Sequence, residues 1–408
     1  MRNFTQGTVA ARRAATTFLA VISSASVIPI LWVVMGILPP YWKFPNHANN
    51  FFIFYHSFPN LLRGNDLYAA HPGLYFDYFL YGPLFAALMG PFALLPPAFS
   101  ALLFLAASTL LFLLAVQLLP LAVPAKNLIL LICLIPFFNN QQHFQTNAFT
   151  AALILLAFSS ALRGRYGLAA LCISAGVLTK LYAGIGALFL AFAQKRFRAG
   201  LALVLVLGLL VVLPAVFSSF DFVLKSYAGW IAALQMKSQA VSQGGSGSFQ
   251  GQSLPGFLQR AANLPKEYLL PVTGIGLILL LLPWLNFRAW NVRRFQFLAL
   301  AAAMMFVVLF SPGAENPTYI ILQAGVAVWF VAGSGLSLRW RLPLLLAVIF
   351  LSSLVSSDLY PDAVKQIFVA YSLRAVPCAI VWFVVLWEMA ACASGTDSGP
   401  DRPGRIDR

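Results

Sequence analysis

The residue types that could do chemistry gather in one early stretch of the chain. Residues 39 to 78 read PPYWKFPNHANNFFIFYHSFPNLLRGNDLYAAHPGLYFDY and hold three of the four histidines and two of the eleven acidic residues. Elsewhere the chain is poor in such groups, because only 9% of it is charged and 61% is hydrophobic. Carboxylates and imidazoles transfer protons in enzymes. We therefore expect this polar stretch to form part of a functional surface.

Two aspartates in this stretch are candidate general bases. Asp66 follows a Gly-Asn turn in RGNDLY, and it is either a cap on the next segment or a base that deprotonates an acceptor hydroxyl. Asp77 lies among aromatic residues in YFDYFLY, a composition found both in sugar sites and in interfacial aromatic belts. The aromatic residues that would line a sugar site are Tyr75, Phe76, Tyr78 and Tyr81.

The histidines do not follow a metal-binding pattern. His47, His56 and His71 are irregularly spaced, and the chain has no HExxH motif. We therefore expect no metal. His71 follows Asp66 by five residues and is a candidate for hydrogen bonding near the site.

Two charged residues farther along the chain are further candidates. Lys180, in GVLTKLYAG, is a lone charge within mostly apolar sequence. It either binds an anion, for which a lipid-linked phosphate is the natural candidate, or extends its amine to the membrane surface. Glu315, in SPGAENPTY, lies at the expected outer end of a span, as a third candidate base or as a helix cap before a proline.

Amide-rich segments supply candidate binding groups for sugar hydroxyls. The connector NNQQHFQTN (139 to 147) contains His143, Gln145 and Asn147. The segment SQAVSQGGSGSFQGQS (238 to 253) is predicted to be a flexible linker or a lid, and it ends in Gln252 and Ser253. Ordinary solvated loops have a similar composition, so both interpretations stay open.

The helices that position these groups are expected to lie in a membrane. The mean hydropathy is +0.84, and apolar runs recur, for example at 98 to 119, 147 to 162 and 374 to 392. Such runs are long enough to cross a hydrocarbon core of about 30 Å. The fold class predicted is all-α, a polytopic transmembrane bundle of roughly 11 to 13 membrane helices. The formal charge of +15 resides mainly in short cytoplasmic connectors, so nucleic acid is not an expected partner.

The resulting topology has both termini in the cytoplasm. We expect a cytoplasmic N-terminus at 1–14, one transmembrane domain at 15–392 with outer loops 39–80 and 218–267, and a disordered cytoplasmic tail at 393–408. Two segments are irregular. Residues 81 to 97 are predicted to lie along the outer interface or to re-enter, and 166 to 194 to form a broken helix pair with Lys180 at its turn.

The distribution of charge over this topology favours an enzyme. All four histidines and seven of the eleven acidic residues fall in the outer segments. An enzyme that works on the outer face needs its ionisable groups there, whereas a transporter more typically places them at mid-membrane. A transporter or flippase of lipid-linked sugars is the rival hypothesis.

Taken in order, these segments resemble glycosyltransferase family 87, the polyprenyl-phosphate-mannose-dependent mannosyltransferase-like proteins of the GT-C class. The likeness spans about residues 15 to 392 and rests on the stretches GNDLYAAHPGLYFDYFLYGPLFAALMGPFALLP, QTNAFTAALILLAFSSALRGR, LTKLYAGIGALFLAFAQKRFRA, GQSLPGFLQR and SPGAENPTY.

This resemblance implies a GT-C-like fold and an activity at the bacterial inner membrane. The implied reaction transfers a hexose such as mannose from a polyprenyl-phosphate donor to a lipid or glycan acceptor on the outer face, with inversion and without a cofactor. An aspartate of the first outer loop would act as the base. Lys180 would neutralise the departing phosphate.

The chain departs from the family pattern at two places. The family usually has an aspartate in a D-x-x-V-Y-type motif, where NNFFIFY offers Asn49 and Asn50, and it tends to have histidines where this chain has Glu315 and its neighbours. An asparagine does not accept a proton usefully. Either the base has moved to Asp66, Asp77 or Glu315, with Asn50 left as a binding group, or the chain is a pseudoenzyme.

Overall fold

The computed structural model describes residues 26–242 and 250–393, and these residues form helices and no strands. The predicted all-α fold class is confirmed. The expected cytoplasmic N-terminus (1–14), the start of the first span, part of the predicted linker (243–249) and the tail from 394 lie outside the described residues.

The helices follow one another mostly with short connections, except for the long segment 64–82 between α3 and α4. The first half of the chain contains α2 (Val27–Tyr41), α3 (Asn49–Arg63), α4 (Pro83–Leu88), α5 (Gly90–Ala93), α6 (Pro97–Gln117), α7 (Val123–Gln142), α8 (Asn147–Leu162), α9 (Tyr166–Thr179), η1 (Leu181–Phe192) and α10 (Arg196–Val212). The second half contains η2 (Leu213–Val216), α11 (Phe220–Ser242), α12 (Leu254–Ala261), η3 (Lys266–Tyr268), α13 (Leu269–Leu281), η4 (Leu282–Leu285), η5 (Phe287–Asn291), α14 (Arg293–Leu309), η6 (Asn316–Thr318), α15 (Tyr319–Val328), η7 (Trp329–Gly333), α16 (Leu338–Val348), η8 (Ile349–Ser353), η9 (Leu354–Ser356), α17 (Asp362–Ala370) and α18 (Ala375–Ala393).

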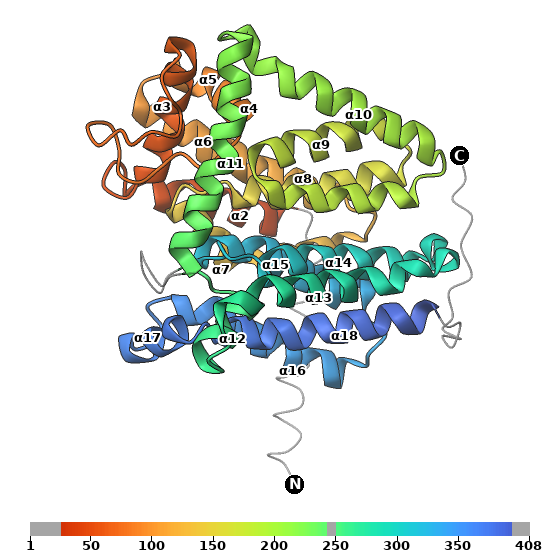
Figure 1. Cartoon of the computed structure of the whole chain (residues 1–408). Coiled ribbons are helices and arrows are strands. Elements are labelled where there is room, and N and C mark those ends of the chain that lie inside the picture. Colours follow the sequence, from red (N-terminus) through yellow and green to blue (C-terminus); the bar gives the residue numbers. More distant parts are fainter. Residues whose placement is uncertain (1–25, 243–249, 394–408) are drawn as a thin grey trace.

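Several of these helices have the length and composition of membrane spans. Five are long and apolar enough, namely Pro97–Gln117, Val123–Gln142, Arg196–Val216, Lys266–Leu285 and Ala375–Cys392. Shorter apolar helices accompany them, including α8 and α9. Figure 1 shows most of the long helices running side by side, while α11 crosses their direction on one side of the molecule.

Helices α14 and α15 form the centre of the bundle. Nearly all their residues are buried, and α14 contains a run of small residues around Ala301. A Cβ atom at Gly325 of α15 would lie 2.8 Å from the carbonyl oxygen of Ala301, so the two backbones approach closely. Small residues permit such close packing in membranes, where the hydrophobic effect does not drive helices together.

Both irregular segments contain short or interrupted helices. Residues 81 to 97 contain α4, which is largely buried, and α5, in which only Gly90 is buried; both are far too short to span a membrane. Residues 166 to 194 contain α9 and the 3₁₀ helix η1, with Lys180 between them.

The prediction of a flexible linker at 238 to 253 was wrong for the two parts of the segment that the structure describes, residues 238–242 and 250–253. Helix α11 continues to Ser242, and Gly251, Gln252 and Ser253 are buried. The backbone of Gln252 donates to the carbonyl of Ala314 (2.8 Å), and its side chain donates to the carbonyl of Val369 (2.9 Å). These contacts hold the segment against the connector that contains Ala314 and against the end of α17 (Asp362–Ala370).

One amide of the connector at 139 to 147 holds three helices together. The side-chain nitrogen of Gln141 in α7 donates to the carbonyls of Gly36 in α2 (3.2 Å) and Leu105 in α6 (3.1 Å). Its oxygen accepts from the hydroxyl of Ser108 (3.1 Å). Because Gln141 is fully buried, these bonds form where water cannot replace them.

A buried carboxylate fastens another part of the bundle. Glu388 of α18 is 1% exposed and accepts from Arg294 (2.9 Å), from the indole of Trp329 (2.7 Å) and from the backbone of Gly335 (2.6 Å). Charge pairing and several hydrogen bonds are what a buried carboxylate requires. These contacts join α14, α15 with η7, and α18.

Candidate functional site

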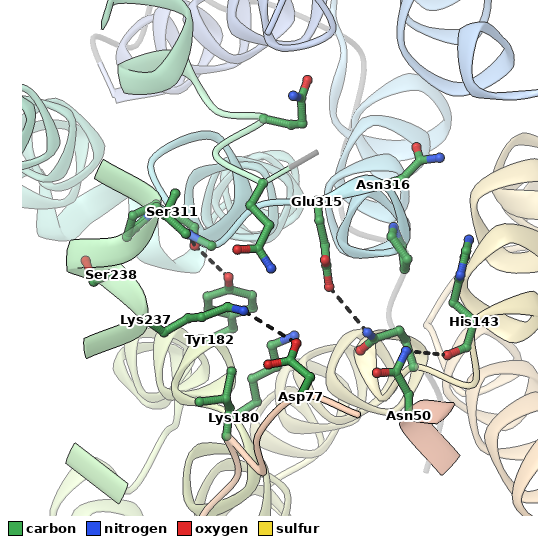
Figure 2. A pocket seen from close by; sticks show the side chains of 18 of the residues that line it. Asn50, Asp77, His143, Lys180, Tyr182, Lys237, Ser238, Ser311, Glu315 and Asn316 are labelled. Carbon is green, nitrogen blue, oxygen red and sulfur yellow. Dashed lines mark hydrogen bonds and ion pairs between the residues drawn. The ribbon is translucent and has the colours of Figure 1, made fainter. Parts of the chain in front are cut away.

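A cavity of about 720 Å³ lies between five parts of the chain. These are the segment predicted to form the first outer loop, the turn between α9 and η1, helix α11, the 311–317 connector and the 365–374 region. Nine of the residues singled out from the sequence line it: Asn50, Asp77, Tyr78, Tyr81, His143, Gln145, Lys180, Gln252 and Glu315. Residues separated by more than 200 positions thus share one polar space. Figure 2 shows several of their side chains turned toward it.

Lys180 is held at the end of α9. Its amine donates to the side-chain oxygen of Asn147 (2.6 Å), at the first position of α8, and lies 5.1 Å from the centre of the Tyr182 ring. Burial lowers the pKa of Lys180 to about 8, although the nearby Glu315 opposes that effect. The amine is therefore cationic at neutral pH. Its neutral neighbours do not balance the positive charge, so the amine is suited to bind an anion.

Glu315 faces the same cavity from the connector after α14. Its Oε1 accepts from the amide of Gln145 (3.3 Å), and the amide oxygen of Gln145 accepts from the hydroxyl of Tyr81 (3.3 Å). Burial raises the pKa of Glu315, while Lys180 and Lys237 act in the opposite direction. A carboxylate in such surroundings is a stronger base than one in water.

Asp77 is presented to the cavity by an unusual backbone. Its φ is +77°, in the left-handed region that non-glycine residues seldom adopt. Its side chain is 40% exposed and forms an ion pair with Lys237 of α11 at 3.5 Å. Figure 2 shows this pair beside Lys180.

Asn49 holds the backbone next to Asp77. Its side-chain nitrogen donates to the carbonyl of Phe76 (2.6 Å), and its side-chain oxygen accepts from the N–H of Phe76 (2.8 Å). An aspartate could accept in this way but could not donate. The neighbouring Asn50 donates to the carbonyl of His143 (2.9 Å) and itself lines the cavity.

A glycine lets the loop after Asp77 reach the end of α9. A Cβ atom at Gly82 would lie 1.9 Å from the carbonyl oxygen of Leu178, so no other residue fits without moving backbone. The N–H of Gly82 points to the carbonyl of Thr179 (3.4 Å). This contact places Tyr81 next to Lys180 in the cavity wall.

The structure leaves six of the predicted residues outside the cavity lining, namely Asp66, His71, Tyr75, Phe76, Asn147 and Ser253. Phe76 is exposed. Asp66 is exposed and accepts from the N–H of Tyr68 (2.9 Å), and the ring of His71 contacts the carbonyl of Asp66 (3.1 Å). Tyr75 is buried in an aromatic-rich cluster that also contains Tyr81, but it does not itself line the cavity. Asn147 lies behind Lys180, and the hydroxyl of Ser253 accepts from Gly256 at the start of α12.

Sequence reasoning missed several polar residues of the lining, among them Tyr182, Lys237, Ser311, Lys365 and Arg374. The hydroxyls of Tyr182 and Ser311 are 2.6 Å apart. A usable signal existed for Lys237, because it is a basic residue in the segment 218–267 assigned to the outer face, where the positive-inside rule predicts few. Arg374 is the first residue of the span expected at 374 to 392.

The described residues offer no group of three or more His, Cys, Asp or Glu side chains that could hold a metal ion. The cavity instead combines amines and a guanidinium with two carboxylates.

Fold and cavity together define a polytopic helical membrane protein in which ionisable and amide side chains from distant parts of the described chain line one pocket. The sequence model of a family described as glycosyltransferase family 87 matches residues 79–312, which is more than half of the chain. The chain belongs to glycosyltransferase family 87 and is, by that membership, a membrane glycosyltransferase. No curated protein matches it. The two cavity carboxylates, Asp77 and Glu315, lie just outside the matched range.

Proposed function

We propose that this glycosyltransferase transfers a hexose such as mannose from a polyprenyl-phosphate donor to a lipid or glycan acceptor. The observation that carries the proposal is that Lys180 and Glu315 line one cavity and affect each other electrostatically. A cation suited to a phosphate and a carboxylate suited to a hydroxyl are the two groups this reaction requires.

The proposed reaction is a single displacement. The acceptor hydroxyl oxygen attacks the anomeric carbon, while the bond from that carbon to the phosphate oxygen breaks and its electron pair leaves with the polyprenyl phosphate. The hydroxyl proton passes to a carboxylate of the enzyme, and the configuration at the anomeric carbon inverts. Lys180 stabilises the charge that develops on the departing phosphate.

Of the two cavity carboxylates, Glu315 is the favoured base. Burial raises its pKa, which increases its proton affinity near neutral pH. Asp77 is the alternative, supported by its strained backbone, which is the kind of conformation that functional sites retain. Asp66 loses support because it does not line the cavity.

The polar side chains around these groups would bind the sugar and the acceptor. Gln145 and Tyr81 are joined by a hydrogen bond beside Glu315, and Asn50, His143 and Gln252 line the same space. We place this cavity on the periplasmic face and both termini in the cytoplasm, because the basic connectors of the sequence then lie inside.

A transfer assay with matched amide variants tests the proposal. Membranes that contain the protein are incubated with radiolabelled polyprenyl-phosphate mannose or another polyprenyl-phosphate hexose. We expect transfer by wild type, a loss of roughly 100-fold or more in Glu315→Gln, since general bases contribute about 10²–10⁴-fold, and a change of less than about twofold in Asp66→Asn, which lies outside the cavity.

The variant Asp77→Asn decides between the two candidate bases. A larger loss in Asp77→Asn than in Glu315→Gln would move the base to Asp77, and undiminished transfer by both would refute the base assignment. Anomeric analysis of the product tests inversion, because a retained configuration excludes the single displacement.

A non-catalytic role is the second candidate, and the presence of asparagines at 49 and 50 favours it. A wild-type protein that binds the donor without transferring sugar, with any donor or acceptor fraction, would support a flippase or a pseudoenzyme.

A further inference from the structure

A second cationic position lies in the cavity wall, on a different element from Lys180. Arg374 directly precedes α18, is only 3% exposed and lines the cavity. Its Nε donates to the carbonyl of Ser352 (2.8 Å), its Nη1 donates to the side-chain oxygen of Asn316, and its guanidinium lies 4.3 Å from the centre of the Tyr319 ring. These contacts fix the orientation of the guanidinium.

Arg374 has no counter-charge within the described part of the chain. No carboxylate there lies within ion-pair distance of it, and the two hydrogen bonds use two of its five N–H donors. A buried cation without an anion is costly, and proteins usually supply a partner or bind one. Lys365 also lines the cavity, but it already pairs with Asp362 (2.8 Å) and Asp358 (3.5 Å).

Arg374 and Lys180 do not share one carboxylate. The charged groups that act on Glu315 are Lys180, Lys237 and Asp77. Arg374 is not among these groups, and it instead donates to Asn316, the residue that follows Glu315. The donor phosphate placed at Lys180 therefore leaves the guanidinium of Arg374 uncompensated.

We propose that Arg374 and Asn316 form a second anion-binding subsite, which holds a phosphate group of the acceptor while Lys180 holds that of the donor. The inference rests on the proposed function and adds a property of the acceptor, namely that it is anionic. A guanidinium fixed in orientation suits a phosphate, since its planar donors match two phosphate oxygens. Both residues lie beyond the range that the family shares with the chain.

The binding test uses the full chain purified in a nonionic detergent, with calorimetry as the readout. The acceptor-type probes are dioctanoyl phosphatidylglycerol, a lipid-borne phosphate, and glycerol 3-phosphate, a water-soluble one. Citronellyl phosphate serves as the short donor-type probe. We expect an acceptor-type probe to bind to wild type. The acceptor-type probe that binds more tightly shows whether the phosphate belongs to a lipid or to a water-soluble molecule.

Asn316→Asp is the informative variant, because the new carboxylate keeps the hydrogen-bond acceptor for Arg374 and neutralises its charge. We expect it, like Arg374→Gln, to weaken binding of the acceptor-type probe at least tenfold, while citronellyl phosphate binding changes less than twofold. Lys180→Gln should show the reverse pattern. Lys365→Gln removes a positive charge from the same cavity and should change neither, because that charge is already paired.

Two results would overturn the proposal. One is unchanged binding of both acceptor-type probes in a folded Asn316→Asp protein; the other is a loss of citronellyl phosphate binding in that variant as large as in Lys180→Gln, which would assign Arg374 to the donor. Binding is measured without turnover. A wild type that shows the expected binding pattern but transfers no sugar would therefore refute the proposed function alone.

Discussion

Asn49 is one of the two asparagines, with Asn50, that stand where the resemblance leads us to expect an aspartate. Its amide both donates to and accepts from the backbone of Phe76, the residue before Asp77. Asn49 therefore supports the backbone that presents the carboxylate of Asp77 to the cavity.

An aspartate at position 49 should therefore lower the transfer rate. In Asn49→Asp a carboxylate oxygen would face the carbonyl of Phe76, and one solvent-exposed hydrogen bond would be lost at a cost of about 0.5–1.5 kcal/mol. We expect transfer to fall by about two- to tenfold, since each 1.36 kcal/mol is one factor of ten. The measurement is transfer rate together with the melting temperature in detergent.

The matched control is Asn50→Asp, which places a carboxylate in the cavity without touching Phe76. A rise in transfer with Asn49→Asp would mean that position 49 is a base site in this chain, and the supporting role assigned to Asn49 would be wrong.

The two perturbed groups of the site predict a bell-shaped pH profile. Glu315 must be ionised to act as a base, and burial raises its pKa above the ordinary 4.5, so transfer should rise with pH through that raised value. Lys180 must be protonated to stabilise phosphate, and its pKa is lowered to about 8. Transfer should therefore fall as pH rises through about 8.

Lys180→Arg tests the alkaline limb, because a guanidinium stays charged at every accessible pH. We expect the fall above about pH 8 to disappear in this variant, measured as the transfer rate relative to its own maximum. An alkaline limb that persists unchanged would show that another group titrates there.

At the scale of elements, the site depends on the contact between the loop at 81 and 82 and the end of α9. Gly82 permits that contact, since its Cα lies against the backbone of Leu178. Backbone atoms cannot rotate away as a flexible side chain can. The loop and the helix must therefore separate if a larger residue replaces this glycine.

Gly82→Ala should move Tyr81 away from Lys180. Inserting a methyl group into such a contact costs about 1–3 kcal/mol, so we expect a lower melting temperature. Because the displacement separates Tyr81 from Lys180, we also expect a lower transfer rate at pH 7. Gly73→Ala is the control, because a Cβ atom there meets nothing within 4 Å. Equal behaviour of the two variants would refute the role assigned to Gly82.

The elements themselves were largely predictable from sequence. The apolar runs expected at 98 to 119, 147 to 162 and 374 to 392 are α6, α8 and α18, because hydrocarbon requires continuous apolar helix. The error at 238 to 253 has an equally physical cause. Glycine and serine favour flexibility in isolation, but tertiary hydrogen bonds to Ala314 and Val369 fix the end of that segment.

The composition of the site was less predictable than its location. Sequence reasoning selected Asp77, Lys180 and Glu315, and the fold places all three around one cavity. It could not separate them from Asp66, which belongs to the same polar stretch as Asp77 but does not line the cavity. Which loops meet in space depends on helix packing over the whole chain, and local composition does not encode it.

For the whole molecule, Glu388 should be a stability determinant that is separate from the site. Replacing it with alanine leaves Arg294 and the indole of Trp329 without their partner, and breaking a buried pair costs about 3–5 kcal/mol. We expect Glu388→Ala to lower the melting temperature in detergent far more than Glu388→Gln, which keeps an oxygen acceptor. The protein that remains folded should transfer sugar at the wild-type rate, and a selective loss of activity would contradict this separation.

The short helices beside the cavity also determine how the protein fits its bilayer. Helix α9 has 14 residues and rises about 21 Å at 1.5 Å per residue, roughly 9 Å less than a typical hydrocarbon core. Hydrophobic mismatch of this size is relieved when lipids thin locally around the short segment. On the topology proposed above, Lys180, at the end of α9, would then lie at the water boundary in a depression of the outer leaflet. The proposed polyprenyl donor, diffusing in the plane of the membrane, would reach it sideways, with its phosphate already at the right depth.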